Sequence, residues 1–170
     1  MCSSDLGSPA INNASPTGAP NHDFFGRARP QGGGFDIGAV ELGASAAAPS
    51  ATLTPAIWTT SAVRGVGLLG PVQAFTLRNT GTVTLTGITQ GALGGTSAAD
   101  YAVVRLLSTC GPAGNGQLLG QTTLAPGAAC VVTVQFRPRA APLPIGLKPA
   151  TLSVTDAAGT QSSALNGTAQ

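Results

Sequence analysis

The sequence predicts an all-β fold for residues 51–170, and three observations predict it. Apolar and polar residues alternate in short segments throughout this range, which is the period of a strand with one buried face. Glycine, proline and asparagine separate these segments at intervals of roughly 10 to 20 residues. No segment carries the sustained 3.6-residue period of an amphipathic helix. About seven short strands with this spacing suit an immunoglobulin-like β-sandwich.

The composition argues against several classes of protein. Charged residues make up 8% of the chain, against about 25% in an average domain. The net charge is +2 and the basic residues are scattered, which argues against a nucleic-acid partner. No apolar run reaches the length of about 18 residues that a membrane span needs. A surface rich in Ser and Thr is typical of exported proteins, yet Met1 opens no signal peptide, so we expect the gene to extend upstream.

The clearest strand covers residues 130–136, where every second residue is apolar. The preceding Pro126-Gly127 suits the centre of a type II turn, because glycine accepts the positive φ needed there. The pattern indicates a half-buried antiparallel strand. Its inward residues are expected to be Cys130, Val132, Val134 and Phe136.

The other expected strands are placed by the same alternation. A strand within residues 71–79 directs Phe75 and Leu77 inward and Thr76 and Arg78 outward. Two more strands, separated by a turn, close the domain and direct Leu152 and Val154 inward. Residues 99–106 are a further candidate. Residues 51–58 are interrupted by Pro55, which predicts an edge or bulged strand. The closing strands are expected in residues 150–156 and 160–167.

Several short motifs carry a family resemblance. They are the Asn-Thr-Gly turn at 79–81, Leu-Ala-Pro-Gly-Ala-Ala-Cys at 124–130 before a strand ending Phe-Arg-Pro, and the closing Leu-Asn-Gly-Thr at 165–168. Together, over about residues 51–168, they resemble the choice-of-anchor D repeat, a bacterial relative of the Ig-like abnormal-spindle/Hydin (ASH) domain. The resemblance implies an Ig-like sandwich near surface-anchoring signals. The segment between Cys110 and Leu124 is longer than usual, and the first strands are hard to align.

A second resemblance covers residues 7–42, which are rich in Gly, Pro and Asn. This segment is similar to the choice-of-anchor Q tail, which closes right-handed parallel β-helix proteins of the pectate-lyase-like kind. Val40 stands where an aromatic residue is common. The β-helix itself would lie upstream, as a partner within the same chain. The matching residues are Ser8-Pro9-Ala10-Ile11, Asp23, Gly26-Arg27, Arg29-Pro30, Asp36-Ile37-Gly38-Ala39 and Glu41.

These resemblances divide the chain into four parts. Residues 1–6, Met-Cys-Ser-Ser-Asp-Leu, resemble the translation of a sequencing adapter joined to a metagenomic contig, in which case Cys2 is not biological. Residues 7–42 are the expected β-helix cap remnant, an irregular segment. Residues 43–50 are small and featureless and are expected to be a linker. Residues 51–170 are the expected sandwich.

The charged residues of the cap segment allow three interpretations. Asp36 and Glu41 could form the acid/base pair of a glycoside hydrolase. Two arginines lie close by, however, and an arginine lowers a carboxyl pKa, which is wrong for a general acid. Calcium bound by Asp23 or Asp36 is the second interpretation. The third, which we favour, is that Arg27 and Arg29 pair with Asp23, Asp36 or Glu41 to fix a glycine-rich cap.

The remaining candidate sites lie in the sandwich. Cys130 is in an inward register and Cys110 follows an expected strand at 108–109, so in an exported sandwich we expect a disulfide, the alternative being two buried thiols. Residues 65–70 match G-x-G-x-x-G but lack the helix and acidic residue of a dinucleotide site. Trp58, Phe75 and Tyr101 could form a sugar-stacking platform. We favour a core role instead, because Phe75 is in an inward register and a tryptophan such as Trp58 more often fills a sandwich core.

The sequence therefore predicts a module with no catalytic residue, no cofactor and no metal. His22 is the single histidine, which leaves no Ser-His or Cys-His arrangement in the sandwich. We expect a structural, adhesion or anchoring role in a secreted or cell-surface bacterial protein, with cell-surface polysaccharide or other surface proteins as partners. The alternative is an accessory, glycan-binding module of a polysaccharide-degrading β-helix enzyme. A microtubule- or cilium-associated role, by analogy with eukaryotic ASH domains, is a third reading.

Overall fold

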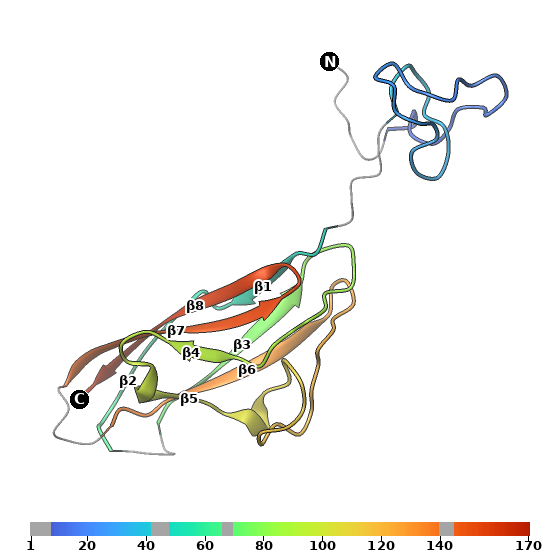
Figure 1. Ribbon diagram of the computed structural model, residues 1–170. Helices are drawn as coiled ribbons and strands as arrows, with labels where there is room; N and C mark the ends of the chain where they lie inside the picture. Colours follow the sequence, from blue (N-terminus) through green and yellow to red (C-terminus); the bar gives the residue numbers. More distant parts are fainter. Residues whose placement is uncertain (1–7, 42–47, 66–69, 140–144) are drawn as a thin grey trace. The chain divides into compact units, whose positions relative to one another are not determined.

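The computed structural model describes residues 8–41, 48–65, 70–139 and 145–170 (Figure 1). The expectations for residues 1–6, for most of the linker at 43–50, and for the centre of the 65–70 motif lie outside the described residues. The chain divides into two compact units, Met1–Ala47 and Ala48–Gln170, and each is described by itself.

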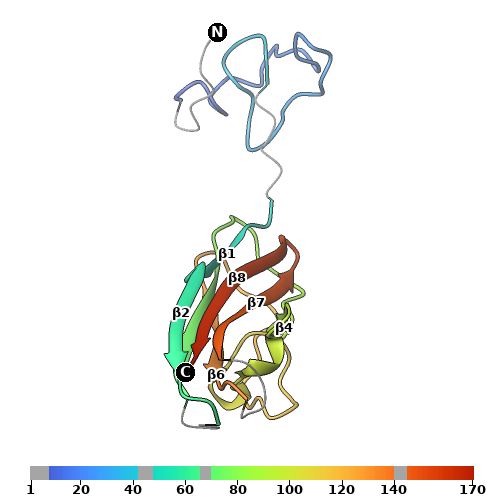
Figure 2. The ribbon, with the colours of Figure 1, turned by 90° about the vertical axis from the view of Figure 1, so that its left-hand side faces the viewer.

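The second unit is an all-β sandwich of two four-stranded sheets packed face to face (Figures 1 and 2). The order of strands, β1-β3-β6-β5 in one sheet and β2-β8-β7-β4 in the other, is the immunoglobulin arrangement with the first strand divided between the sheets. The strands of the first sheet are β1 (Ala51–Thr54), β3 (Val72–Asn79), β6 (Ala129–Phe136) and β5 (Tyr101–Val103). Those of the second are β2 (Ile57–Ala62), β8 (Gly159–Ala169), β7 (Gly146–Asp156) and β4 (Ala92–Gly94).

The core lies between the sheets, and the expected inward residues form its centre. Phe75 and Leu77 of β3, with Leu152 and Val154 of β7, are fully buried. All four inward residues expected on β6 are buried as well, so the predicted register of these strands is confirmed. The outer face of β6, which the sequence predicts to be exposed to solvent, is partly buried. Thr133 and Gln135 are also buried there, because the Thr133 hydroxyl donates to the Leu107 carbonyl and the Gln135 amide to the Gly70 carbonyl.

The expectation of one interrupted strand over residues 51–58 needs correction. The segment forms two strands in opposite sheets: β1 pairs antiparallel with β3, and β2 pairs parallel with β8. Pro55 lies in the crossing between them. Proline cannot donate to a ladder, so it fits the point where the chain leaves one sheet for the other. Both strands are sheet edges, which is the part of the prediction that holds.

The candidate strand at 99–106 is also shorter than expected. Only Tyr101–Val103 is a strand, β5, and it lies between the 3-10 turns η2 (Ala98–Asp100) and η3 (Arg105–Leu107). Residues 108–109, which are described, do not form the strand expected before Cys110. They follow η3 as an irregular segment. The chain leaves the sheet edge early, and η3 then covers part of β6.

The first unit has no regular strand in its described part, residues 8–41. Two isolated bridges, Ala14 with Phe35 and His22 with Ala28, bring its turns together. None of the buried apolar core cluster belongs to it. Its structure therefore depends on polar contacts, which are described with the candidate site.

Candidate functional site

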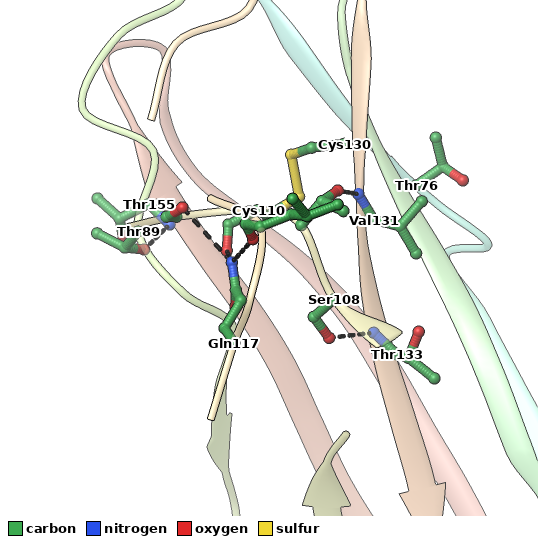
Figure 3. The surroundings of a disulfide bond; sticks show 12 residues. Thr76, Thr89, Ser108, Cys110, Gln117, Cys130, Val131, Thr133 and Thr155 are labelled. Carbon is green, nitrogen blue, oxygen red and sulfur yellow. Dashed lines mark hydrogen bonds between the residues drawn. A yellow bond between two sulfur atoms is a disulfide. The ribbon is translucent and has the colours of Figure 1, made fainter. Parts of the chain in front are cut away.

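Cys110 and Cys130 form a disulfide in the core of the sandwich (Figure 3). Their Sγ atoms are 2.04 Å apart, and both residues are buried. Cys130 lies on β6 opposite Leu77 of β3, and Cys110 lies in the loop that follows η3. The bond therefore holds the segment between the two cysteines, which are 20 positions apart, against the middle of a sheet.

The loop closed by the disulfide is held by a buried amide that sequence reasoning missed. The Gln117 Nε2 donates to the carbonyl oxygen of Cys110 at 3.0 Å (Figure 3). It also donates to the carbonyl oxygen of Leu119 at 2.9 Å. Gln117 is 3% exposed, and its Oε1 has no partner among the described residues. No periodicity or motif marks this residue, because it lies in a loop without a regular pattern. Its role follows only from the return of the loop onto Cys110.

Polar side chains before Cys110 take the place of an edge strand along β6. The backbone N–H groups of Thr109 and Cys110 both donate to the Val131 carbonyl, and the Thr109 hydroxyl accepts from the Val131 N–H at 3.0 Å. The Ser108 hydroxyl accepts from the Thr133 N–H at 2.9 Å (Figure 3). The hydrogen-bonding groups of β6 are thus satisfied beyond the end of β5.

In the first unit, Glu41 is the buried acceptor that joins several turns. Its Oε1 accepts from Arg29 Nε at 2.6 Å and from the Asp36 N–H at 3.0 Å, and its Oε2 accepts from the Gln31 N–H at 2.9 Å. Both side chains of the Arg29–Glu41 ion pair are buried. Desolvation raises the pKa of Glu41, but these backbone hydrogen bonds and the Arg29 charge outweigh it, and the pKa lies below its ordinary value.

Asp23 performs the same task at a second point. Its Oδ1 accepts from the N–H groups of Phe25, at 2.9 Å, and Arg27, at 2.8 Å, and its Oδ2 accepts from the Glu41 N–H at 3.3 Å. Desolvation raises the pKa of Asp23, while these hydrogen bonds and the Arg27 charge lower it, with a net decrease. Asp36 completes the group by accepting from the Asn12 N–H at 2.8 Å.

The structure thus joins the five predicted cap residues in one network, to which Arg27 contributes its backbone N–H and the other four their side chains. Arg29 bridges Glu41 and the Asp36 carbonyl, the latter through Nη2 at 2.8 Å. Arg27 instead extends over the Phe25 ring, with 6.0 Å from its guanidinium carbon to the ring centroid. Among the described residues, no group of three or more His, Cys, Asp or Glu side chains is placed to hold a metal ion. The carboxylates tether backbone turns, and the pKa values of Asp23 and Glu41 are lowered, which does not suit a general acid.

The alternative of a sugar platform formed by Trp58, Phe75 and Tyr101 is wrong, and the core role favoured for Phe75 and Trp58 is confirmed, because all three side chains are buried. Their rings meet in an edge-on cluster inside the sandwich. The Tyr101 hydroxyl donates to the Lys148 carbonyl at 2.7 Å and accepts from the Gly167 N–H at 2.6 Å. It therefore joins β5 of one sheet to β7 and β8 of the other. Burial raises the pKa of this phenol, so it stays a neutral donor.

The exposed aromatic residues lie in the first unit instead. Phe24 and Phe25 are 78% and 66% exposed, and their rings meet edge-to-face with centroids 5.4 Å apart. Asp23 fixes the turn that carries them. No helix in the described ranges is long and apolar enough to cross a membrane.

Comparison with known proteins places the chain in no family. No family model and no curated protein matches it. Similar solved structures include the secreted serine protease VesC from Vibrio cholerae (18% identity, TM-score 0.45, 73% of this chain and 23% of that chain). Others are a family 123 glycoside hydrolase from Clostridium perfringens (9%, 0.46, 72% and 27%) and the VesB protease of Vibrio cholerae (20%, 0.38, 72% and 31%). This chain spans less than a third of each, and the similarity transfers no activity.

Proposed function

We propose that this chain is a non-catalytic structural, adhesion or anchoring part of an exported bacterial surface protein. The observation that carries the proposal is the Cys110–Cys130 disulfide, which lies in the interior of an Ig-like sandwich. Disulfides of this kind form and persist in oxidising compartments, outside the cytosol. A covalent link between a long loop and the central strand β6 suits a domain that must stay folded outside the cell.

The buried polar groups support a structural role in the same way. The carboxylates of Asp23 and Glu41 each accept from two or more backbone N–H groups. The Tyr101 hydroxyl, which comes from β5 of one sheet, donates to β7 and accepts from β8 of the other. A general acid or a nucleophile needs a raised carboxyl pKa or an activating base. These groups have backbone partners instead, and each holds two or more segments together.

Within this proposal, residues 8–41 close an upstream β-helix domain of the same chain. The end of a β-helix exposes apolar side chains and unpaired edges that need a cover. The unit offers exposed apolar side chains on turns fixed by Asp23 and Glu41. These side chains are Phe24, Phe25, Ile37 and Val40.

The anchoring role is tested with the full chain coupled to fluorescent beads. Beads carrying the oxidised chain should be retained on washed bacterial cells or on cell-wall polysaccharide. Beads carrying chain that is first reduced and unfolded, and uncoupled beads, serve as controls. Equal retention of all three bead types would contradict adhesion. Turnover of a peptide, ester or glycoside substrate that a substitution in this chain abolishes would contradict the non-catalytic assignment.

The alternative, an accessory glycan-binding module of a polysaccharide-degrading enzyme, is favoured by one observation. Phe24 and Phe25 present aromatic surface to solvent on a fixed turn, and sugar rings pack against such faces. A glycan array probed with the full chain should then show binding that Phe24→Ala and Phe25→Ala remove. Ile37→Ala, a change at another exposed apolar residue, should leave it intact. An array without any bound glycan would remove this alternative.

A further inference from the structure

The sandwich ends in four edge strands, and one of them differs from the rest. β1 has four residues, and β4 and β5 have three each, whereas β2 has six. Short edges, charges and prolines prevent a sheet from recruiting another strand. β2, with the sequence Ile-Trp-Thr-Thr-Ser-Ala, contains neither a charge nor a proline. Figure 2 shows β2 as the outermost strand of its sheet, with β8 and β7 following on one side.

The backbone of β2 has one used side and one open side. The Ala56 carbonyl accepts from the Ala164 N–H, and the Ala62 carbonyl from the Gln170 N–H. The main-chain N–H and C=O groups of successive residues point to opposite sides of a strand. Those of every second residue from 56 therefore point toward β8, and those of the residues between them point away from β8. Among the described residues β8 is the one strand that pairs with β2, and no backbone hydrogen bond from a described loop reaches the outward set. That set is Ile57, Thr59, Ser61 and Val63.

The side chains of the outward set are self-complementary. In order they are apolar, hydroxyl, hydroxyl and apolar, and all four residues are exposed, Ile57 and Val63 at 60% each. An antiparallel second copy of residues 57–63, which are β2 and the following Val63, would set Ile57 opposite Val63 and Thr59 opposite Ser61 when centred on Thr60. Apolar pairs and Thr–Ser pairs directly opposite each other are favourable, and no like charges meet. Each opposed outward pair also exchanges two backbone hydrogen bonds.

We propose that the β2 edge is a self-association surface, on which two copies of this chain pair β2 antiparallel to β2 about a two-fold axis at Thr60. The pairing joins two four-stranded sheets into one continuous sheet and removes the open edge of both copies. A single strand pair buries less area than a standard protein interface. The association is therefore weak and becomes visible at high protein concentration, as on a crowded cell surface.

Sedimentation equilibrium of the full chain, in a Cys2→Ser background, tests the proposal over a wide concentration range. A monomer–dimer equilibrium is expected. The double variant T59K/S61K sets lysines directly opposite each other in the dimer and should weaken association by about tenfold or more. The matched control is T52K/T54K, which places two lysines on exposed threonines of the short edge β1. It should leave the dimer unchanged.

Cysteine cross-linking tests the register. Ile57→Cys chains mixed with Val63→Cys chains should give a covalent heterodimer on mild oxidation. Neither variant alone should cross-link, because in this register two copies of position 57 lie six residues, about 20 Å, apart. A monomer at every concentration would overturn the proposal. So would equal weakening by both lysine pairs, self-cross-linking of Ile57→Cys, or pairing of β2 only with an extended segment of another protein.

Discussion

Reduction of the Cys110–Cys130 disulfide should lower the free energy of unfolding of the sandwich by about 3 kcal/mol. The bond closes a loop between cysteines 20 positions apart. The chain-entropy relation for a loop of this length gives an entropy of about 11 cal/mol/K, or about 3.3 kcal/mol at 25 °C. Reduction removes no heavy atom, but it adds a hydrogen to each sulfur and moves the two buried sulfurs from bonding to van der Waals distance, so any strain from repacking adds to this value. The effect is then chiefly the greater freedom of the unfolded chain.

The same quantity sets the expected change in melting temperature. An unfolding entropy of about 2.1 cal/mol/K per residue, applied to the unit Ala48–Gln170, converts 3.3 kcal/mol into a decrease of about 13 °C. The assay is thermal and denaturant unfolding of the Cys2→Ser chain with and without reductant. Trp58 fluorescence reports the sandwich alone, because this is the one tryptophan and it lies in its core.

Two outcomes would refute this reasoning. Equal stability of the oxidised and reduced chains, within about 0.5 kcal/mol, would mean that the loop is ordered in both states without the bond. A shift in the slope of the denaturant curve with no shift in stability would mean that the disulfide acts on the compactness of the unfolded state instead.

Three further changes test other parts of the structure. Tyr101→Phe removes the partner of the buried Gly167 N–H and should lower stability by about 1–3 kcal/mol in urea titration; an unchanged midpoint would contradict the inter-sheet role of the hydroxyl. Gly167→Ala places a Cβ 2.4 Å from Phe136 Cε2, whereas a Cβ at Gly94 meets nothing within 4 Å, so the first should cost about 1–3 kcal/mol and the second far less; similar losses would contradict the packing. Because the pKa values of Asp23 and Glu41 are lowered in the folded unit, their stabilisation is present above the ordinary carboxyl range and is lost as the pH falls through the folded values. NMR amide signals of Gln31 and Arg27 should therefore change on acidification, and less so at Gln31 in Glu41→Gln; a flat response would contradict the tethering.

The central strands could be predicted from the sequence because each buries one face. β3, β6 and β7 alternate over most of their length, so Phe75, Val132 and Leu152 could be placed inward from the pattern alone. The disulfide could be expected from the inward register of Cys130 together with the expectation that the protein is exported. Local pattern and global fold agree in these segments.

The edges and loops could not be predicted in the same way. Pro55 signals an interruption, but a one-dimensional pattern does not distinguish a bulge from a crossing between sheets. The segment after Val103 is largely apolar, yet it turns into η3, and the Thr109 and Ser108 side chains satisfy β6 where a longer strand would have done so. Gln117 matters only through the three-dimensional return of its loop. The Arg29–Glu41 pair was one of several pairings that the sequence allowed.

The most direct test of the central claim is non-reducing peptide mapping of the chain after export into an oxidising compartment. We predict recovery of the Cys110 peptide joined to the Cys130 peptide, in protein that retains native Trp58 fluorescence and resists protease. Natively folded exported protein with both thiols free, or with either cysteine joined to Cys2, would contradict an exported sandwich stabilised by its own internal cross-link.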